Sequence, residues 1–502
     1  MNIEQRILIV GAGLSGLSMA RWCLREGAKT VTLVDTREAA IDAAKAALPQ
    51  ANARCSALDQ AFMQELEPQA VYLSPGLSPE QLQAVTAWCD THHVAVNNEL
   101  DLFMSGLERH CPEHGQAPRV LAITGTNGKT TVTALTTFLL RSVGVEAVSA
   151  GNIAPAMLDA LGAELDQQRW PQAWVLELSS FQLHASHGFE PTIGTLLNIS
   201  DDHLDWHPTR AHYIEAKSKV WGVAAQRLLN RDDAEVMAFK PADPPAKNRR
   251  RKDAEPMPPA WYSFGLDVPT RAGDWGVESV NGMAWLVRAK GIDTGATDPY
   301  ADEDIYIQRL MPAEALRIRG QHNWGNALAA LALAHAVSQD TAGMLHALRE
   351  YAGEPHRVQP IGVIAGVEYF DDSKGTNVGA TLAALNGLGS ERRLVVILGG
   401  QGKGQDFSPL RQPLLRCARG VVVFGQDANV IVQTLEGTAL TIARADSMAS
   451  AVREAALLAQ SGDAVLLSPA CASLDMFRNY SERGQAFTQQ VLAMAEEAGG
   501  PL

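Results

Sequence analysis

The residues best suited to chemistry form the run Thr124-Gly125-Thr126-Asn127-Gly128-Lys129-Thr130, which follows an apolar stretch at 119–123. In such a loop, backbone N–H groups and the N-terminus of the following helix hold phosphates. Lys129 is placed to reach the terminal phosphates, and Thr130 to offer a hydroxyl group to Mg²⁺. The strict P-loop pattern has glycine where Ile123 stands. A purely structural turn is the alternative, but the lysine and threonine at the helix start favour ATP binding.

Ligands suited to a metal ion follow two further apolar stretches. Glu177 comes at the end of the first of these stretches. The second is followed by the run Asn198-Ile199-Ser200-Asp201-Asp202-His203-Leu204-Asp205. Parallel α/β sheets carry their sites at the carboxyl ends of the strands, and Mg²⁺ prefers oxygen ligands. Taken singly, a glutamate at a strand end such as Glu177 is more often a cap or a surface group, and His203 could be a structural histidine. The cluster as a whole favours a metal-binding site.

A second glycine-rich turn, Gly11-Ala12-Gly13-Leu14-Ser15-Gly16, follows the first apolar stretch, and Asp35 ends the next one. This pattern is typical of dinucleotide binding, with the acidic residue on a ribose. The same turn also suits the diphosphate of a UDP-linked sugar. The motif by itself therefore leaves NAD and a UDP-sugar unresolved, although no other group of residues indicates hydride transfer.

The helices and strands expected to position these residues indicate an α/β fold with three domains. A chain of 502 residues exceeds what one core usually supports, and apolar strands alternate with helical stretches throughout, as in parallel sheets covered by helices. We expect a Rossmann-like domain over 1–108, a central P-loop ATPase-like parallel sheet over 109–352 and a Rossmann-like domain over 353–502. The polar segment 108–118 is predicted to be a linker, and the proline-rich, basic segment 240–259 a disordered insertion.

Composition narrows the class of protein. The formal net charge of −14 argues against a nucleic-acid-binding surface, which needs a basic stripe. The N-terminal apolar stretch is too short for a signal peptide or a membrane span. The six cysteines lack metal-site or disulfide spacing, which indicates reduced thiols. We expect a cytoplasmic monomer without membrane insertion.

Together these residues resemble the Mur ligase family, and the resemblance extends over all three predicted domains. It is carried by the ATP loop with its isoleucine, and by Glu177-Leu178-Ser179-Ser180-Phe181-Gln182, Asp202-His203-Leu204-Asp205, Gly320-Gln321-His322-Asn323 and His356-Arg357. Further runs resemble the members that add D-glutamate to UDP-N-acetylmuramoyl-L-alanine: Asp35-Thr36-Arg37, Asp371-Asp372-Ser373-Lys374-Gly375-Thr376-Asn377, Gly399-Gly400-Gln401-Gly402-Lys403 and Leu467-Ser468-Pro469-Ala470-Cys471-Ala472-Ser473-Leu474-Asp475. The resemblance implies ATP-dependent amide-bond formation in peptidoglycan precursor synthesis.

The resemblance also implies three groups of binding residues. ATP would be bound by Gly125, Thr126, Asn127, Gly128, Lys129, Thr130, Thr131, Asn323, Asn326, Arg357, Asp372 and Lys374. The UDP-linked substrate would be bound by Leu14, Ser15, Asp35, Thr36, Arg37, Gly76, Asn152, Ser179 and Gln182. D-glutamate would be bound by Thr376, Lys403, Ser473, Leu474 and Tyr480, where the family usually shows phenylalanine at the last position.

Catalysis is assigned by the same resemblance to Lys129, Glu177, His203 and Lys217. Two Mg²⁺ ions would be held by Thr130, Glu177, His203 and Lys217, the last carbamylated by CO₂; an unmodified surface lysine is the alternative. Lys129 and the ions would neutralise the γ-phosphate while the substrate carboxylate attacks it. The amine of D-glutamate would then attack the acyl phosphate. His203 is a candidate for the base.

Three alternatives stay open. The first is another ligase of the same architecture or a folylpolyglutamate synthetase, which would use a different amino acid or substrate. The second is an NAD-dependent oxidoreductase fused to an ATPase, which would bind nicotinamide. The third is a nucleotide-gated interaction module, whose ATP turnover would not respond to any amino acid.

Overall fold

The computed structural model describes residues 6–203, 206–223, 225–241, 261–292, 305–390 and 392–497. Of the insertion predicted at 240–259, all but the first two residues lie outside these ranges. The chain divides into two compact units. The first comprises Met1–Val277, Val287–Arg309 and Leu328–Leu345, and the second comprises Glu278–Leu286, Leu310–Ala327 and His346–Leu502.

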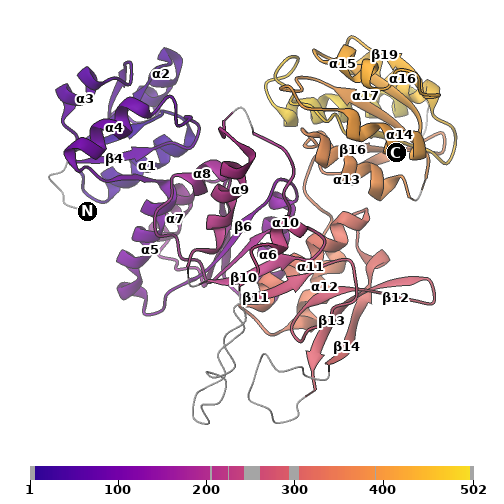
Figure 1. Cartoon of the computed structure of the whole chain (residues 1–502), viewed down its shortest axis with the longest axis horizontal. Coiled ribbons are helices and arrows are strands. Elements are labelled where there is room, and N and C mark those ends of the chain that lie inside the picture. The colour runs from indigo at the N-terminus through magenta and orange to yellow at the C-terminus, as the bar shows by residue number, and fades with distance from the viewer. Residues whose placement is uncertain are drawn as a thin grey trace. The chain divides into compact units, whose positions relative to one another are not determined.

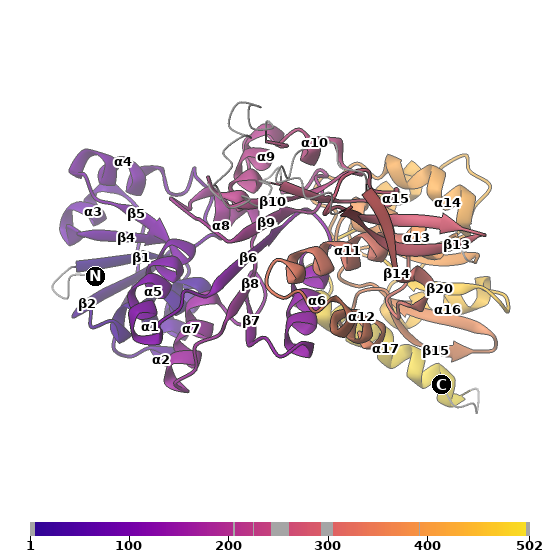
Figure 2. The ribbon, with the colours of Figure 1, turned by 90° about the horizontal axis from the view of Figure 1, so that it is seen from below.

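The first sheet has five parallel strands in the order β3-β2-β1-β4-β5. Figure 1 labels its strand β4 and the helices α1 to α4. Figure 2 shows β2, β1, β4 and β5 side by side. The strand order reverses at β1, so the glycine-rich turn after it lies at the switch point where such sheets bind ligands. The strands are β1 Arg6–Val10, β2 Thr30–Asp35, β3 Asn52–Cys55, β4 Ala70–Leu73 and β5 Val96–Asn98, and the helices are α1 Leu14–Arg25, α2 Glu38–Ala47, α3 Gln60–Leu66, α4 Gln83–His92 and α5 Glu99–His114.

The prediction of a linker at 108–118 is wrong for its first part. Helix α5 begins with a capping box between Asn98 and Asp101 and continues through Pro112 to a left-handed Gly115. Contacts hold its last turns: the ring of His114 stacks on Trp170 at 4.5 Å. Packing of this kind overrides the local preference of proline and polar residues against helix. The non-helical connection is therefore confined to residues 115–118.

The second sheet has the order β14-β13-β12-β11-β10-β9-β6-β8-β7. Its strands from β7 to β11 pair in parallel, and the side chains of β6 and β8 are almost fully buried apart from Arg119. The strands are β6 Arg119–Thr124, β7 Ala147–Gly151, β8 Ala173–Glu177, β9 Ile193–Leu196, β10 Gln226–Asn230, β11 Trp261–Phe264, β12 Trp275–Val280, β13 Met283–Gly291 and β14 Ile305–Pro312. The helices that follow them in the chain are α6 Lys129–Ser142, α7 Met157–Asp166, α8 Ser180–His184, α9 Arg210–Ser218, η1 Lys219–Trp221, α10 Ala234–Met237, η3 Ala313–Ala315, α11 Gln321–His335 and α12 Thr341–Glu350.

The third sheet has the order β15-β16-β20-β17-β18-β19, parallel except for β15 at its edge. Alternate residues of β17 enter two separate cores, Val396 and Leu398 on one face and Val395 and Ile397 on the other. Helices therefore cover both faces, as expected for a Rossmann-like sheet. The strands are β15 Gln359–Ile364, β16 Val367–Asp371, β17 Leu394–Gly399, β18 Ala418–Phe424, β19 Thr441–Arg444 and β20 Ala464–Leu467, with helices α13 Val378–Leu388, η4 Ser408–Leu410, α14 Arg411–Cys417, α15 Ala428–Thr434, α16 Met448–Leu458 and α17 Tyr480–Glu497.

The α/β prediction with three sheets is confirmed. Within the ranges given above, no helix is both long and apolar enough to cross a membrane.

Candidate active site

The predicted phosphate loop joins β6 to α6. Gly128 takes a left-handed conformation (φ 82°) directly before the first helical residue, Lys129. The ammonium group of Lys129 lies over the loop and donates to the carbonyl oxygens of Gly125 and Thr126, both at 2.8 Å. Thr130 and Thr131 follow in the first turn of α6, where unpaired helix N–H groups favour anions. The loop thus has the strand, turn and helix that phosphate binding requires.

The segment after β9 fixes this loop from one side. Asn198 accepts a hydrogen bond from the backbone N–H of Asn127 (2.8 Å) and donates to its carbonyl (3.1 Å). The hydroxyl of Thr126 lies 2.9 Å from that of Tyr213 and donates to the carbonyl of Ser200. These bonds hold the loop backbone in shape.

Glu177 ends β8 beside the loop and is almost fully buried. Its Oε1 accepts a hydrogen bond from Nδ2 of Asn152 (3.0 Å), and its carbonyl accepts one from the backbone N–H of Asn152 (2.7 Å). Gly151 is required here, because a Cβ would lie 2.2 Å from the carbonyl oxygen of Glu177. Oε2 has no partner among the described residues. A buried carboxylate oxygen of this kind fits a Mg²⁺ ion.

Lys217 extends from α9 to the same loop. Its side chain is 2% exposed, and its ammonium group donates to the carbonyl of Gly125 at 2.8 Å. Burial lowers the pKa of Lys217 well below its ordinary value, and the positive charge of Lys129 lowers this pKa further. The side chain also lies over the ring of Tyr213, 4.7 Å from its centroid. The solvated surface lysine considered above is therefore excluded.

His203 lies on the turn after β9 in a left-handed conformation (φ 55°), with its ring edge-on to Phe181 at 4.8 Å. Nε2 of His203 is 3.7 Å from a carboxylate oxygen of Asp202. In the part of the chain that the structure describes, no three histidine, cysteine or carboxylate side chains gather as a metal site. Asp205 lies outside that part. Because Mg²⁺ usually keeps waters and phosphate oxygens in its shell, one or two protein ligands still fit it.

At the other glycine-rich turn, Asp35 accepts hydrogen bonds from the backbone N–H of Ala12 (2.8 Å) and from Nε and Nη2 of Arg37 (both 2.9 Å). Hydrogen bonding by Arg37 lowers the pKa of Asp35 to about 2. Gly16 is required because a Cβ would lie 1.8 Å from the carbonyl oxygen of Gly11. Leu14 is 81% exposed.

Five other predicted substrate residues lie outside this turn or have structural partners. Thr36 accepts a weak hydrogen bond through its carbonyl from Cys55, and Gly76 has open space where a Cβ would be. Ser179 and Gln182 form the capping box of α8. Asn152, predicted to help at the uridine end, donates a hydrogen bond to Glu177.

The second unit holds the remaining predicted ATP residues. Asp372 is buried and accepts hydrogen bonds from the hydroxyl of Ser468 (2.7 Å) and the N–H of Val358 (3.2 Å). Burial raises the pKa of Asp372 to about 7, although the nearby positive Arg357 opposes this rise. The ammonium of Lys374 lies 3.8 Å from the ring centroid of Tyr480. In α11, Asn326 donates to Asn323, which donates to the carbonyl of Arg319.

Two loops of the same unit contain the residues predicted for D-glutamate. Lys403 follows the glycine run after β17 with φ 53°, and Gln401 in that run pairs with Ala472 after β20. Ser473 is buried, whereas the adjacent Leu474 is 63% exposed. Thr376 donates its N–H to the carbonyl of Lys374.

Comparison with known proteins identifies the family. Models of the Mur ligase MurD-like N-terminal domain, the Mur ligase middle domain and the Mur ligase glutamate ligase domain match residues 5–94, 123–252 and 356–471. The UDP-N-acetylmuramoylalanine–D-glutamate ligase of Albidiferax ferrireducens is 50% identical over 499 residues, covering 99% of this chain and 97% of its own. The chain belongs to the Mur ligase family.

Two further comparisons agree. A protein of the same name from Polaromonas is 44% identical over 99% of both chains, so the resemblance to the D-glutamate-adding members is confirmed. The crystal structure of MurF ligase from Thermotoga maritima in complex with ADP covers 99% of both chains with a TM-score of 0.57 at 15% identity. This last likeness shows the shared fold.

Arg483 of this Mur ligase was missed by sequence reasoning. It is fully buried in α17 and donates to the carbonyl oxygens of Ser373 (2.8 Å) and Cys471 (3.0 Å). It thereby joins the loop that contains Thr376 to the loop that contains Ser473. Arg483 is the fourth residue of α17, and a charged residue in the first turn of a helix gives no sequence signal of such burial.

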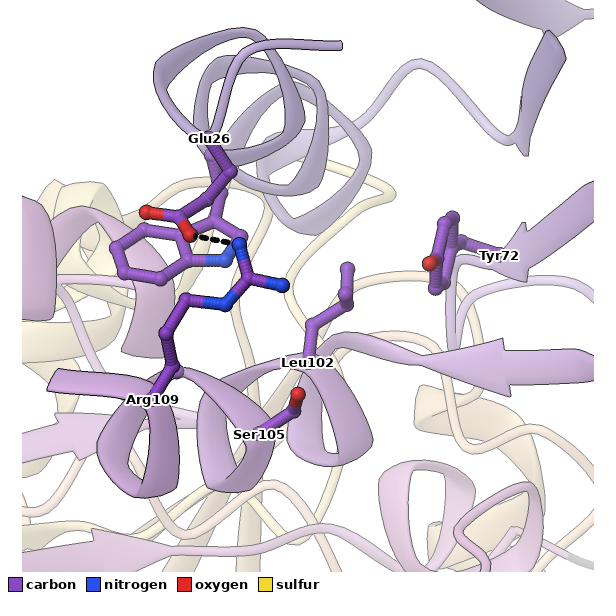
Figure 3. A pocket seen from close by; sticks show the side chains of 7 residues that line it. Glu26, Tyr72, Leu102, Ser105 and Arg109 are labelled. Carbon is purple, nitrogen blue, oxygen red and sulfur yellow. Dashed lines mark hydrogen bonds and ion pairs between the residues drawn. The ribbon is translucent and has the colours of Figure 1, made fainter. Parts of the chain in front are cut away.

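A pocket of about 140 Å³ in this Mur ligase lies between α1, β4 and α5 (Figure 3). Trp22, Tyr72, Leu102, Ser105 and Gly106 line it, and an ion pair between Arg109 and Glu26 (2.8 Å) lies along it. None of the residues predicted for ATP, metal or substrates lines this pocket.

Proposed function

We propose that this Mur ligase joins D-glutamate to UDP-N-acetylmuramoyl-L-alanine with ATP, releasing ADP and phosphate, in peptidoglycan precursor synthesis. The observation that carries this proposal is the meeting of Lys129, Lys217 and the phosphate loop at one carbonyl oxygen, beside the buried Glu177. The relatives of the same printed name, 44% and 50% identical over almost the whole chain, support the choice of substrates.

Lys129 places a positive charge where the γ-phosphate of ATP would lie, which favours attack on it by the substrate carboxylate. The attack forms an acyl phosphate and releases ADP; the amine of D-glutamate then attacks the acyl carbon, and phosphate leaves. A carboxylate is otherwise a poor acyl donor toward an amine. When bound, two Mg²⁺ ions would neutralise the phosphate charge. Thr130, Glu177, His203 and Lys217 would hold them, and His203 is our candidate for the base that takes the amine proton.

Lys217 would act as a carbamate. A buried amine cannot easily carry its charge, and Lys217 shares its acceptor with another ammonium group. Reaction with CO₂ turns the amine into an anionic group that offers oxygen ligands to Mg²⁺. Its position beside Glu177 and the phosphate loop supports this role.

The two loops of the second unit would receive D-glutamate, through Thr376, Lys403, Ser473, Leu474 and Tyr480. ATP would also contact Asn323, Asn326, Arg357, Asp372 and Lys374. Lys403 offers a cation for a carboxylate of the amino acid. Lys403→Ala should therefore raise the KM for D-glutamate far more than the KM for ATP. Equal changes in both constants would refute this assignment.

The uridine diphosphate end would lie on Leu14, Ser15, Asp35, Thr36, Arg37 and Gly76 in the first sheet. Ser179, Gln182 and Asn152 would support the substrate from the second sheet. We also place the protein in the cytoplasm, because the proposed substrates are ATP and nucleotide-linked precursors. We further propose that it acts as a monomer.

ADP release with UDP-N-acetylmuramoyl-L-alanine and a panel of amino acids tests the function. We expect release with D-glutamate and little with L-glutamate, L-alanine or a diamino acid. Release with another amino acid would indicate a different ligase. Release that ignores every amino acid would indicate a nucleotide-gated module, and nicotinamide binding would favour the oxidoreductase.

A further inference from the structure

The short helix α8 carries two residues assigned to the UDP-linked substrate, Ser179 at its N-cap and Gln182 in its first turn. It spans only the five residues Ser180–His184, and a helix of this length is unstable on its own. The last carbonyl groups of a helix also have no partner within it. The position of Ser179 and Gln182 therefore depends on bonds from other parts of the chain.

Asn98 supplies such a bond from the first sheet. It is the last residue of β5 and the N-cap of α5, and only 2% of it is exposed. Its Nδ2 donates to the carbonyl oxygen of Gln182 at 2.7 Å, and this bond is buried. Loss of the donor would remove the bond from α5 that holds the carbonyl end of α8.

The same side chain also caps α5. Its Oδ1 accepts hydrogen bonds from the backbone N–H groups of Leu100 (2.9 Å) and Asp101 (3.1 Å). The amide oxygen thus faces two donors while the amide nitrogen faces an acceptor, which fixes the orientation of the amide. Serine, threonine and aspartate cap helices as well, but asparagine carries its acceptor and its donor on separate atoms. Asparagine is therefore suited both to cap α5 and to hold α8.

A second bond between the same two segments supports this contact. Oδ1 of Asp101 accepts a hydrogen bond from the backbone N–H of His187 (2.8 Å), just beyond α8, and its Oδ2 accepts one from the N–H of Asn98 (3.0 Å). The helices α5 and α8 pack together. Glu177, which precedes α8, is held separately by Asn152. The contact with α5 thus fixes the substrate residues rather than the proposed metal ligand.

We propose that Asn98 is a positioning residue that holds α8, and with it Gln182, in place for the UDP-linked substrate. Oε1 of Gln182 accepts hydrogen bonds from the N–H (2.9 Å) and the hydroxyl (3.1 Å) of Ser179, which leaves Nε2 to donate to the substrate. This inference rests on the proposed function in assigning Gln182 to that substrate. Asn98 acts on affinity for the UDP-linked substrate and leaves the KM for ATP unchanged, because its contacts reach α8 and not the phosphate loop.

Calorimetric titration with UDP-N-acetylmuramoyl-L-alanine, together with the KM for each substrate, tests the proposal on the full-length protein. Asn98→Ser keeps an oxygen that caps α5 but lacks the amide donor. We expect about five- to tenfold weaker binding of the UDP-linked substrate, with an unchanged KM for ATP. Asp59→Ser is the matched control, because Asp59 is the N-cap of α3 and accepts a hydrogen bond from the N–H of Phe62 (2.9 Å). This control should bind like the wild type.

A double-mutant cycle separates positioning of Gln182 from a general effect on the fold. If Asn98 acts through Gln182, the change Asn98→Ser should weaken binding little further once Gln182→Ala is present. Full additivity of the two losses would overturn the proposal. Unchanged binding in Asn98→Ser, or an equal loss in Asp59→Ser, would overturn it as well.

If Asn98→Ser does not fold, Asn98→Thr decides, since threonine also caps helices without an amide; unaltered substrate affinity in that variant refutes the role. If the wild type binds no UDP-linked substrate, the proposed function fails and the inference fails with it. If the wild type binds this substrate and Gln182→Ala binds it equally well, the assignment of Gln182 fails, and the inference with it. A loss in Gln182→Ala with none in Asn98→Ser refutes the inference alone.

Discussion

Lys129 and Lys217 donate to the same acceptor, the carbonyl oxygen of Gly125, each at 2.8 Å. Two ammonium groups at one oxygen repel each other, and the effect is strong where water is excluded. Lys129 is only partly buried, whereas Lys217 is inaccessible. Burial and the charge of Lys129 lower the pKa of Lys217 well below its ordinary value, and a neutral amine is the form that reacts with CO₂.

The first prediction concerns this modification. Protein equilibrated with ¹³C-bicarbonate should show one carbamate carbon signal in the NMR spectrum that disappears in Lys217→Arg. Exhaustive removal of CO₂ should lower the ligase rate, and bicarbonate should restore it. Lys219→Arg is the control, because Lys219 is only partly buried and its ammonium group donates to the carbonyl oxygen of His184. A signal that persists in Lys217→Arg would contradict the assignment.

The second prediction concerns Asn152, which orients Glu177 through its side-chain amide. Residues that orient a metal ligand typically contribute about 10- to 100-fold to metal affinity or activity. Asn152→Ala should therefore raise the Mg²⁺ concentration needed for half-maximal activity by about tenfold. A change confined to the KM for the UDP-linked substrate would instead support a role of Asn152 at the uridine end.

Much of the fold was predictable because apolar runs bounded by glycine or polar residues encode buried strands. The strand Arg119–Thr124 lies where the apolar stretch at 119–123 predicts it, and the phosphate loop between this strand and the following helix was equally clear. The end of α5 was not predictable, because its last turns depend on packing against residues distant in the chain.

The partners of individual side chains were less accessible to sequence reasoning. The contact of Asn152 with Glu177 depends on the register between β7 and β8, which places Gly151 opposite Glu177. The burial of Arg483 likewise results from helix packing, and charged residues are rarely buried. Sequence reasoning therefore predicts the chemical groups of the candidate site more readily than the residues that position them.

The third prediction uses two helical glycines at the packing of α1, α5 and α7. A Cβ on Gly106 would lie 2.7 Å from the ring of Trp22 and 3.0 Å from Leu161, whereas the nearest atom to a Cβ on Gly162 is 3.9 Å away. Gly106→Ala should destabilise the protein by about 1–3 kcal/mol through overpacking. Gly162→Ala should be neutral or stabilise by up to about 1 kcal/mol, from helix propensity. Urea unfolding measures both, and equal effects would contradict the packing described.

The fourth prediction concerns pH. Burial raises the pKa of Asp372 to about 7, above the value of about 3.9 for an unfolded aspartate. The folded state therefore binds more protons between these values, so the stability that this group contributes is fully present below about pH 4 and is lost as the pH rises through 7.

Asp372→Asn removes this titration. Between pH 5 and pH 8, the wild type without nucleotide should lose more unfolding free energy than Asp372→Asn, with a difference of up to about 3 kcal/mol. Urea unfolding at both pH values provides the comparison. Parallel losses in the two proteins would show that Asp372 is already ionised at pH 5.

The transfer of an oxygen atom tests the central claim most directly. UDP-N-acetylmuramoyl-L-alanine labelled with ¹⁸O in its alanyl carboxylate is incubated with ATP, Mg²⁺ and D-glutamate, and the released phosphate is analysed by mass spectrometry. Attack of the carboxylate on the γ-phosphate predicts one ¹⁸O atom in each phosphate formed with the amide product. Phosphate without ¹⁸O, formed alongside amide product, would contradict the acyl-phosphate account.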